Sequence, residues 1–300
     1  MIELRHLRYL VAVAEEGHVT RAAARLGIQQ PPLTRQIHDL EAAVGTPLFD
    51  RTPRGVRLTE AGEAVVEAAR AILDQAAGLP DLAGRAARGE RGRIAIGYTS
   101  SAAFHPFVVR EIRAFGQASP QVRLALEEES TAELVRDLAN GRLDAAFLRA
   151  PPGEAADLRI DPLLEEPMAA ALPPGHPLAA RTQGIALEDL AGETFVLYRR
   201  LAGPGLYDAI IAACHAAGFS PTVGQEAPRM PSTLSLVAAG LGVSLTPASM
   251  RRLNVDGVTL VPLNRAHGLT APLMLATRRQ RSAATERFRE AMCTAARLEA

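Results

Sequence analysis

Hydrophobic residues over positions 1–45 recur with the period of an α-helix, in three short blocks. The first two blocks end at Gly17 and Gly27, and glycine commonly ends a helix. The apolar positions are Leu4, Leu7, Leu10, Val11 and Ala14; then Val19, Ala22, Ala23 and Leu26; then Leu33, Ile37, Leu40 and Val44. Because proline is tolerated in the first helical turn, Pro31 and Pro32 predict that the third helix begins at Pro31.

A short turn over residues 27–30 joins the second and third predicted helices, which is typical of a helix-turn-helix. The outward face of the third helix carries hydrogen-bonding side chains: Gln30, Thr34, Arg35, His38 and Glu41. Such a face is either a plain solvated surface or one that contacts a partner. The stretch LFDRTPRGVRLT, residues 48–59, then predicts a β-hairpin, or wing, with Arg51, Arg54 and Arg57 at its tip and flanks.

Helical periodicity returns at residue 59, with Thr59 as the expected N-cap. One face of this helix is apolar: Val65, Val66, Ala69, Ile72, Leu73 and Ala76. An apolar stripe needs a partner, and we expect the same helix of a second copy to supply it. Gly78 and Pro80 should kink or end the helix, leaving residues 81–92 as a last turn and hinge.

From residue 93 onward, strand-like and helix-like segments alternate. Strands are predicted at 93–97, 122–126 and 144–148, helices at 104–118 and 131–140, and a last helix at about 281–298. This alternation predicts a mostly parallel α/β architecture of two Rossmann-like lobes facing a cleft, with crossings near 162 and 266. Residues 230–250 carry no charged side chain. Their prolines and glycines nevertheless favour a buried helix and strand over a membrane span.

Charge and cysteine content narrow the possible partners. All 33 basic residues are arginine and they balance 33 acidic residues, so affinity for nucleic acid must come from a local patch. Residues 1–58 hold eight arginines against six acidic residues, a net charge of +2. Cys214 and Cys293 are far apart without metal-site spacing, which predicts two reduced thiols in a cytoplasmic protein. We expect no secretory signal, because Arg5 and Arg8 interrupt the N-terminal apolar run.

The motifs of common enzymes are missing. The sequence contains no GxSxG, no GxxxxGK[ST] and no HExxH, and its seven histidines are scattered. We therefore expect no enzyme activity, no metal and no cofactor.

Hydroxyl groups follow two predicted strands of the larger domain. Thr99, Ser100 and Ser101 come after the strand at 93–97, and Ser130 with Thr131 follows the next strand, in each case at the start of a predicted helix. Parallel strands bring such ends to one crevice, where helix N-termini accept anions. Arg149, after the strand at 144–148, would point into the same crevice and bind an anion. The alternatives are plain N-caps and, for Arg149, a salt bridge to Glu127, Glu128 or Glu129.

Residues 4–62 resemble the winged helix-turn-helix of the LysR-type transcriptional regulators, with several motifs in order. The segments GRIAIGY, NGRLDAAFLR, HPLA, LVAAGLGVSLTPAS and PLMLATR are similar to the effector-binding domain of the same family. Within the family, QQPPLTRQI, IGYTSS and EST look most like the branch that responds to muconate and related products of aromatic catabolism.

The resemblance implies the fold and the partners. It implies a winged helix-turn-helix over 1–58, a linker dimerisation helix and hinge over 59–92, and a periplasmic-binding-protein-like effector domain over 93–300. The lobes of that domain would be 93–162 with 266–300, and 163–265. A homo-oligomer, most simply a dimer of dimers, would bind double-stranded promoter DNA and could contact RNA polymerase.

The resemblance also assigns site residues by motif. Gln30, Pro31, Thr34 and Arg35 would face the DNA, and Arg54 would lie in the wing. Ser100, Ser101, Thr131 and Arg149 would meet a small carboxylate effector, such as a muconate or an aromatic acid, beside the apolar side chain of Leu206. Gln29 and His18 depart from the usual family residues at the caps of the third and second helices, and Pro80 departs from them in the linker.

The expected function is activation of a catabolic operon in the cytoplasm, away from any membrane. The alternative is a cytoplasmic small-molecule-binding protein or enzyme that has a regulator-like fold.

Overall fold

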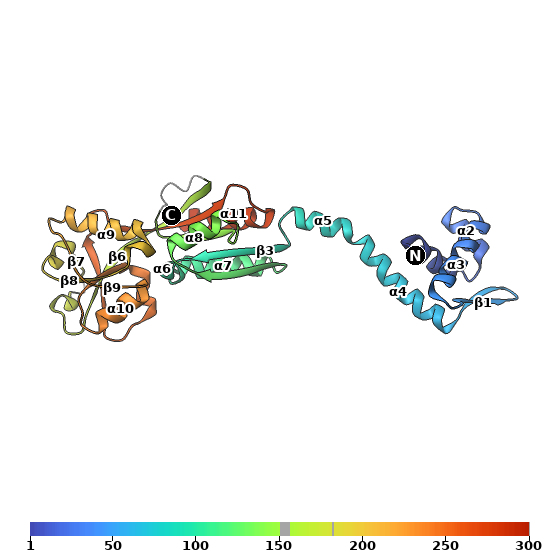
Figure 1. Cartoon of the computed structure of the whole chain (residues 1–300), viewed down its shortest axis with the longest axis horizontal. Coiled ribbons are helices and arrows are strands. Elements are labelled where there is room, and N and C mark those ends of the chain that lie inside the picture. Colours follow the sequence, from blue (N-terminus) through green and yellow to red (C-terminus); the bar gives the residue numbers. More distant parts are fainter. Residues whose placement is uncertain (151–156, 182, 300) are drawn as a thin grey trace. The chain divides into compact units, whose positions relative to one another are not determined.

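The computed structural model describes residues 1–150, 157–181 and 183–299, which form two units, Met1–Gly84 and Arg85–Ala300 (Figure 1). The first unit begins with α1 (Leu4–Glu16), α2 (Val19–Leu26) and α3 (Gln30–Val44). Leu33, Ile37 and Leu40 are buried in its core, as the helical period predicts. The helix α3 begins at Gln30, one residue earlier than predicted, because the first residue of a helix needs no N–H partner and Gln30 can adopt helical angles before Pro31.

The caps of α2 and α3 differ. His18 caps α2, since its Nδ1 accepts a hydrogen bond of 3.3 Å from the N–H of Thr20. Gln29 holds the N-cap position of α3 but makes no side-chain hydrogen bond there. The recognition-type helix therefore starts with prolines and without a side-chain cap.

The predicted wing is formed by β1 (Phe49–Thr52) and β2 (Gly55–Leu58), an antiparallel pair. Gly55 has φ +143°, and a Cβ atom there would lie 2.2 Å from the carbonyl oxygen of Gly17. The N–H of Val56 donates to this same oxygen at 2.9 Å. Only glycine therefore lets the wing approach the end of α1 so closely.

The linker is helical for longer than predicted. The helix α4 (Glu60–Ala77) begins with the predicted cap, since the Oγ1 of Thr59 accepts from the N–H of Gly62 at 2.9 Å. It ends before Gly78, as expected, but α5 (Leu79–Ala87) follows where the sequence predicted a last turn and hinge. This part of the prediction was wrong because Pro80 lies in the first turn of α5, where proline is tolerated.

The second unit begins with one lobe built around parallel strands. Its elements are β3 (Gly92–Tyr98), α6 (Ser100–Ala103), α7 (Pro106–Ala118), β4 (Val122–Glu128), α8 (Thr131–Ala139), β5 (Ala145–Leu148) and, from the end of the chain, α11 (Ala283–Glu299). The strand β3 lies between β4 and β5 and is parallel to both. Ile94 and Ile96 pack with residues of α7 and α11, whereas Ala95 packs with residues of α8, so helices cover both faces.

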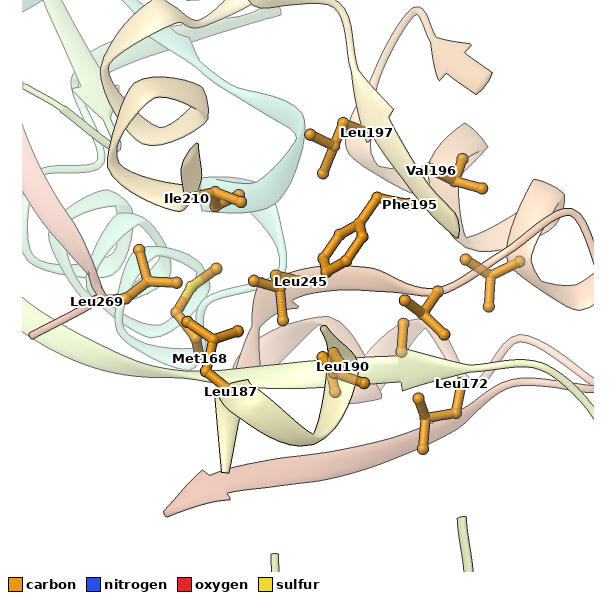
Figure 2. Close-up of a cluster of buried hydrophobic side chains, with 14 of the residues drawn as sticks. Met168, Leu172, Leu187, Leu190, Phe195, Val196, Leu197, Ile210, Leu245 and Leu269 are labelled. Carbon is orange, nitrogen blue, oxygen red and sulfur yellow. The ribbon is translucent and has the colours of Figure 1, made fainter. Parts of the chain in front are cut away.

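The other lobe contains β8 (Thr194–Tyr198), α9 (Pro204–Ala216), β9 (Thr222–Ala227), α10 (Met230–Ala238) and β10 (Ser244–Pro247). Shorter elements complete it: β7 (Ile185–Ala186), β11 (Thr259–Arg265) and the 3-10 helices η1 (Pro177–Ala180), η2 (Leu187–Leu190), η3 (Arg200–Ala202) and η4 (Ala248–Leu253). Figure 2 shows the core of this lobe, where Phe195, Leu245 and Ile210 face one another. The helix α10 and the fully buried β10 confirm the predicted buried helix and strand in the uncharged segment.

Two long strands join the lobes, β6 (Leu158–Leu172) and β12 (Thr270–Arg278). Residues 158–167 of β6 pair with β12, and residues 168–172 pair with β10 and β11, in every case antiparallel. The eight-stranded sheet is therefore mixed, and the prediction of a mostly parallel sheet was wrong. The start of β6 escaped detection because it contains Pro162, which is accommodated at a register shift opposite Leu273 and Met274.

Two further observations complete the fold. Cys214 is buried and Cys293 is half-buried, and neither forms a disulfide, as the sequence predicts. Within the described ranges, no helix combines the length and the apolar character needed to cross a membrane.

Candidate functional site

A cavity of about 440 Å³ lies between the two lobes of the second unit. One wall comes from the ends of β3, β4 and β5, and the other comes from the end of β8 and the starts of α9 and α10. The five residues that the sequence assigned to the effector all line it: Ser100, Ser101, Thr131, Arg149 and Leu206. The structure thus brings them together, while their contact with a ligand stays a prediction.

Strand order explains why these residues meet. In the sheet, β3 lies between β4 and β5, and all three are parallel, so their C-terminal ends reach the same edge. Glu129, Thr99 and Arg149 follow the three strands in that spatial order. Neighbouring strands are about 4.8 Å apart, so this edge spans about 10 Å from Glu129 to Arg149.

Arg149 is not the free cation that the sequence suggested. Its side chain is 4% exposed, and its Nη1 donates to the Oε2 of Glu166 at 2.7 Å. Its Nη2 donates to the carbonyl oxygen of Ser101 at 2.9 Å. The alternative, a salt bridge to Glu127, Glu128 or Glu129, was wrong, because the partner of Arg149 is Glu166 of β6. Of the three side-chain nitrogen atoms of Arg149, the buried Nε is the one without a hydrogen-bond partner among the described residues.

Glu166 connects several elements behind the cavity. Its Oε1 accepts from the N–H of Ser249 in η4, and its Oε2 lies 3.7 Å from the Nε2 of His105. Burial lowers the pKa of His105, although the Glu166 carboxylate opposes that shift. The neutral form of His105 is therefore favoured, and Arg149 is the cation that balances Glu166.

The start of α8 is occupied by its own side chains. The Oε2 of Glu133 accepts from the N–H of Ser130 at 3.1 Å and from its Oγ at 2.7 Å, while Ser130 Oγ accepts from the N–H of Glu133. This capping box is visible in the sequence as STAE, and Ser130 takes the plain N-cap role that was the alternative to ligand binding. Burial and the adjacent Glu133 raise the pKa of Glu129, which also lines the cavity.

The opposite wall supplies residues that sequence reasoning missed. Arg229 reaches across the cavity, with Nη1 bonded to the Oε1 of Glu128 and Nη2 at 3.7 Å from the Oε2 of Glu129. Arg199, after β8, lines the cavity and forms no ion pair with any residue that the structure describes. No local motif marks either arginine, since each depends on contacts between distant segments.

Tyr198 fixes the start of α9 at the cavity. Its Oη donates to the carbonyl oxygen of Gly203 at 3.0 Å, and burial raises its pKa, so it stays protonated. Gly203 is the N-cap of α9 and provides no side-chain cap. Leu206, two residues inside the helix, is 5% exposed and forms an apolar part of the wall.

A second candidate surface lies on the first unit. Gln30, Pro31, Thr34 and Arg35 are exposed on the first turns of α3, where Thr20 Oγ1 donates to Gln30 Oε1 at 3.1 Å. Arg54 is exposed in the turn between β1 and β2. Neither Arg35 nor Arg54 forms an ion pair within the described part of the chain, so both guanidinium groups are free for anionic partners.

Metal binding finds no support in these sites. Over residues 1–150, 157–181 and 183–299, no three histidine, cysteine or acidic side chains come close enough to hold an ion.

Two family models match the chain. The model of the bacterial regulatory helix-turn-helix proteins of the lysR family matches residues 4–63, and that of the LysR substrate binding domain matches residues 87–297. The transcriptional regulator BudR of Raoultella terrigena is 41% identical, over 96% of this chain and 99% of BudR. CatR of Pseudomonas putida is 37% identical over 93% of each chain.

Solved structures agree with these matches. The structure of full-length CbnR in complex with its target DNA aligns with a TM-score of 0.81 and 28% identity, over 98% of this chain and all of CbnR. Full-length BenM aligns with a TM-score of 0.62 and 32% identity, over 99% and 98% of the two chains. The chain therefore belongs to the LysR family of transcriptional regulators, with a helix-turn-helix unit followed by a substrate-binding domain.

Proposed function

We propose that this regulator binds promoter DNA through α3 and the wing. The observation that carries this proposal is the pair of unpaired, exposed arginines, Arg35 and Arg54, on adjacent elements of a winged helix-turn-helix. Gln30 and Thr34 lie beside Arg35 at the leading end of α3, the part of a recognition helix that reaches base edges. Glutamine can pair with adenine, arginine with guanine or phosphate, and Pro31 and Thr34 offer apolar groups to thymine methyls.

Footprinting on the region upstream of its own gene tests the DNA proposal. Arg35→Ala should weaken or abolish protection, because a base or phosphate contact is lost. Arg252→Ala, which removes another exposed arginine, from the substrate-binding domain, is the charge-matched control and should leave protection intact. Unchanged protection in Arg35→Ala would show that Arg35 does not contact the operator.

The cavity between the lobes is the proposed effector site, and its ligand is a small carboxylate such as an aromatic acid or a muconate. Two buried donors in its wall, Thr99 Oγ1 and Arg149 Nε, have no partner among the described residues. A carboxylate accepts hydrogen bonds only, so it would satisfy both. Ser100, Ser101 and Thr131 stand beside them, and Leu206 would contact the carbon skeleton.

Effector binding would act on transcription by favouring one arrangement of the protein over another. We propose activation of a catabolic operon in the cytoplasm, with RNA polymerase as a further partner. Calorimetry with benzoate and muconate tests the binding step, and Leu206→Glu should abolish any heat by placing a buried charge against the ligand. A retained signal in that variant would place the ligand elsewhere.

The linker supports a homo-oligomer. Ile72, Leu79 and Leu82 on α4 and α5 are exposed to 44%, 58% and 39%, although large apolar side chains gain by burial. We propose that these helices pack against a second copy, and that two such dimers form a tetramer. Ile72→Asp should lower the mass measured by light scattering, whereas an unchanged mass would place the interface elsewhere.

We propose no enzyme activity for this chain. The ionisable groups of the cavity serve one another as ion pairs and caps, as Arg149 does with Glu166 and Glu133 with Ser130.

A further inference from the structure

The cavity has two chemically different ends along the edge of the sheet. Thr99 and Arg149, which follow β3 and β5, bring the two unpartnered donors. At the other end, Glu129 directly follows β4 and Glu133 lies in α8, and each contributes a carboxylate to the cavity lining. Two strand spacings, about 10 Å, separate the backbone at Glu129 from that at Arg149, so one small ligand can reach both ends.

The donor end accommodates one carboxylate group. Thr99 is 9% exposed and Arg149 is 3% exposed, so both donors are costly to leave unsatisfied. The charge of Arg149 is already balanced by Glu166, and the ligand would use the remaining Nε hydrogen. The ligand carboxylate is therefore held by these hydrogen bonds and by Arg199, which lines the cavity and forms no ion pair with a described residue.

The acidic end repels a second carboxylate. Glu129 and Glu133 both line the cavity, and the neighbouring Glu133 carboxylate adds to the effect of burial in raising the pKa of Glu129. Arg229 faces Glu129 but is shared with Glu128, and Arg136 and Asp137 are the other charged groups that act on this pair. A third carboxylate would enter without a cation of its own, and like charges in a partly buried site disfavour binding.

Resting on the proposed effector site, we infer that Glu129 and Glu133 restrict the effector to a monocarboxylate with a hydroxyl or similar hydrogen-bond donor at its other end. Carboxylate oxygens accept hydrogen bonds, so they match a donor and reject an acceptor-only dianion. This inference narrows the effector class proposed above: aromatic monocarboxylates remain candidates, whereas dicarboxylates such as muconate become poor ligands because Glu129 and Glu133 reject them.

Calorimetry on the full chain with three ligands of one shape tests the inference. Benzoate, 4-hydroxybenzoate and terephthalate share a ring and a carboxylate and differ only at the para position; butyrate, 4-hydroxybutyrate and succinate form an acyclic series. In mildly alkaline buffer, the hydroxylated acid of at least one series should bind most tightly. Its dicarboxylate should bind at least about tenfold more weakly than the unsubstituted acid.

Glutamine variants assign the effect to the two acids. Glu129→Gln with Glu133→Gln should raise the affinity for the dicarboxylate about tenfold or more and leave that for the unsubstituted acid within about threefold. Glutamine can keep the capping role of Glu133, so the start of α8 should stay folded. Glu127→Gln, near the end of β4 but outside the cavity lining, is the matched control and should change neither affinity.

Different failures have different meanings. Dicarboxylates that bind as tightly as monocarboxylates in the unmodified protein would overturn the inference and leave the effector site standing. Equal affinity for hydroxylated and unsubstituted acids would overturn the donor preference. If no acid of either series binds to any variant, the proposed effector site fails and the inference fails with it.

Discussion

Arg149 Nη1 lies 2.7 Å from Glu166 Oε2, and the two side chains are 4% and 5% exposed. Arg149 follows β5, whereas Glu166 belongs to β6, the strand that both lobes share. The N–H of Ser249, from η4, donates to the same carboxylate. This ion pair therefore lies behind the cavity where segments of both lobes meet.

Removing one partner of this ion pair should destabilise the protein strongly. Arg149→Met leaves Glu166 buried without a cation, so the free energy of unfolding should fall by about 3–5 kcal/mol. Arg149→Met combined with Glu166→Leu leaves no charge and should recover part of that loss. Urea denaturation followed by circular dichroism measures each value.

The control for that prediction is an exposed ion pair near the start of β6. Arg159→Ala breaks a contact of 3.3 Å with Asp161, but Arg159 is 46% exposed, so its cost should stay below about 1 kcal/mol. Equal costs for Arg149→Met and Arg159→Ala would show that burial adds nothing to the first ion pair.

Elements with local signals were predictable from the sequence. Gly17 and Gly27 adopt the left-handed conformation that ends α1 and α2, and residues 33–40 bury the expected stripe. The convergence of Ser100, Thr131 and Arg149 was predictable as well, because the ends of consecutive parallel strands meet at one edge.

Features that depend on distant pairing were not predictable. Glu166 lies in β6, and the prolines Pro162 and Pro167 of this strand are typical of loops. The sequence therefore gave no signal for the bond between Glu166 and Arg149. Arg229 and Glu128 are 101 residues apart, and their contact depends on how the two lobes fold. The sequence therefore located the cavity but misjudged its charge, since it missed the acids and arginines that face one another across it.

The missing cap of α3 has a cause in the first turn of the helix. An N-cap side chain accepts from the N–H of the second or third helical residue, and here these are Pro31 and Pro32, which have no N–H. Gln29→Ser should therefore leave the free energy of unfolding of the first unit within about 0.5 kcal/mol of that of Gln29→Ala, which cannot cap. Thermal unfolding followed by circular dichroism measures both variants. A serine variant more stable than the alanine variant by about 1 kcal/mol would contradict this explanation.

Arg54 in the wing should contribute to the salt dependence of DNA binding. If its guanidinium neutralises one phosphate, Arg54→Ala should lower the slope of log Kd against log salt by about one unit. Arg57→Ala is the matched control, because Arg57 already faces Asp50 at 3.7 Å and should change the slope less. Fluorescence anisotropy over a salt series measures both slopes, and equal changes would contradict a special role for Arg54.

Glu286 in α11 should make stability depend on acid pH. Bonds from Arg289, at 2.7 Å, and from Arg281 lower its pKa to about 2. A carboxylate whose pKa is lowered by folding stabilises the protein above its ordinary pKa of about 4.5, and this contribution disappears as the pH falls towards 2. Its side chain is 32% exposed, so after solvent screening we expect about 1–2 kcal/mol at neutral pH.

Glu286→Gln should lose this contribution at neutral pH and approach the stability of the unmodified protein as the pH falls below about 4. Urea denaturation across this range measures the difference, with Glu290→Gln, exposed on the same helix, as a control that should differ by less than about 0.5 kcal/mol. A difference between Glu286→Gln and the unmodified protein that stays constant with pH would show that Glu286 acts through neutral hydrogen bonds. In that case its charge would contribute nothing to the stability of α11.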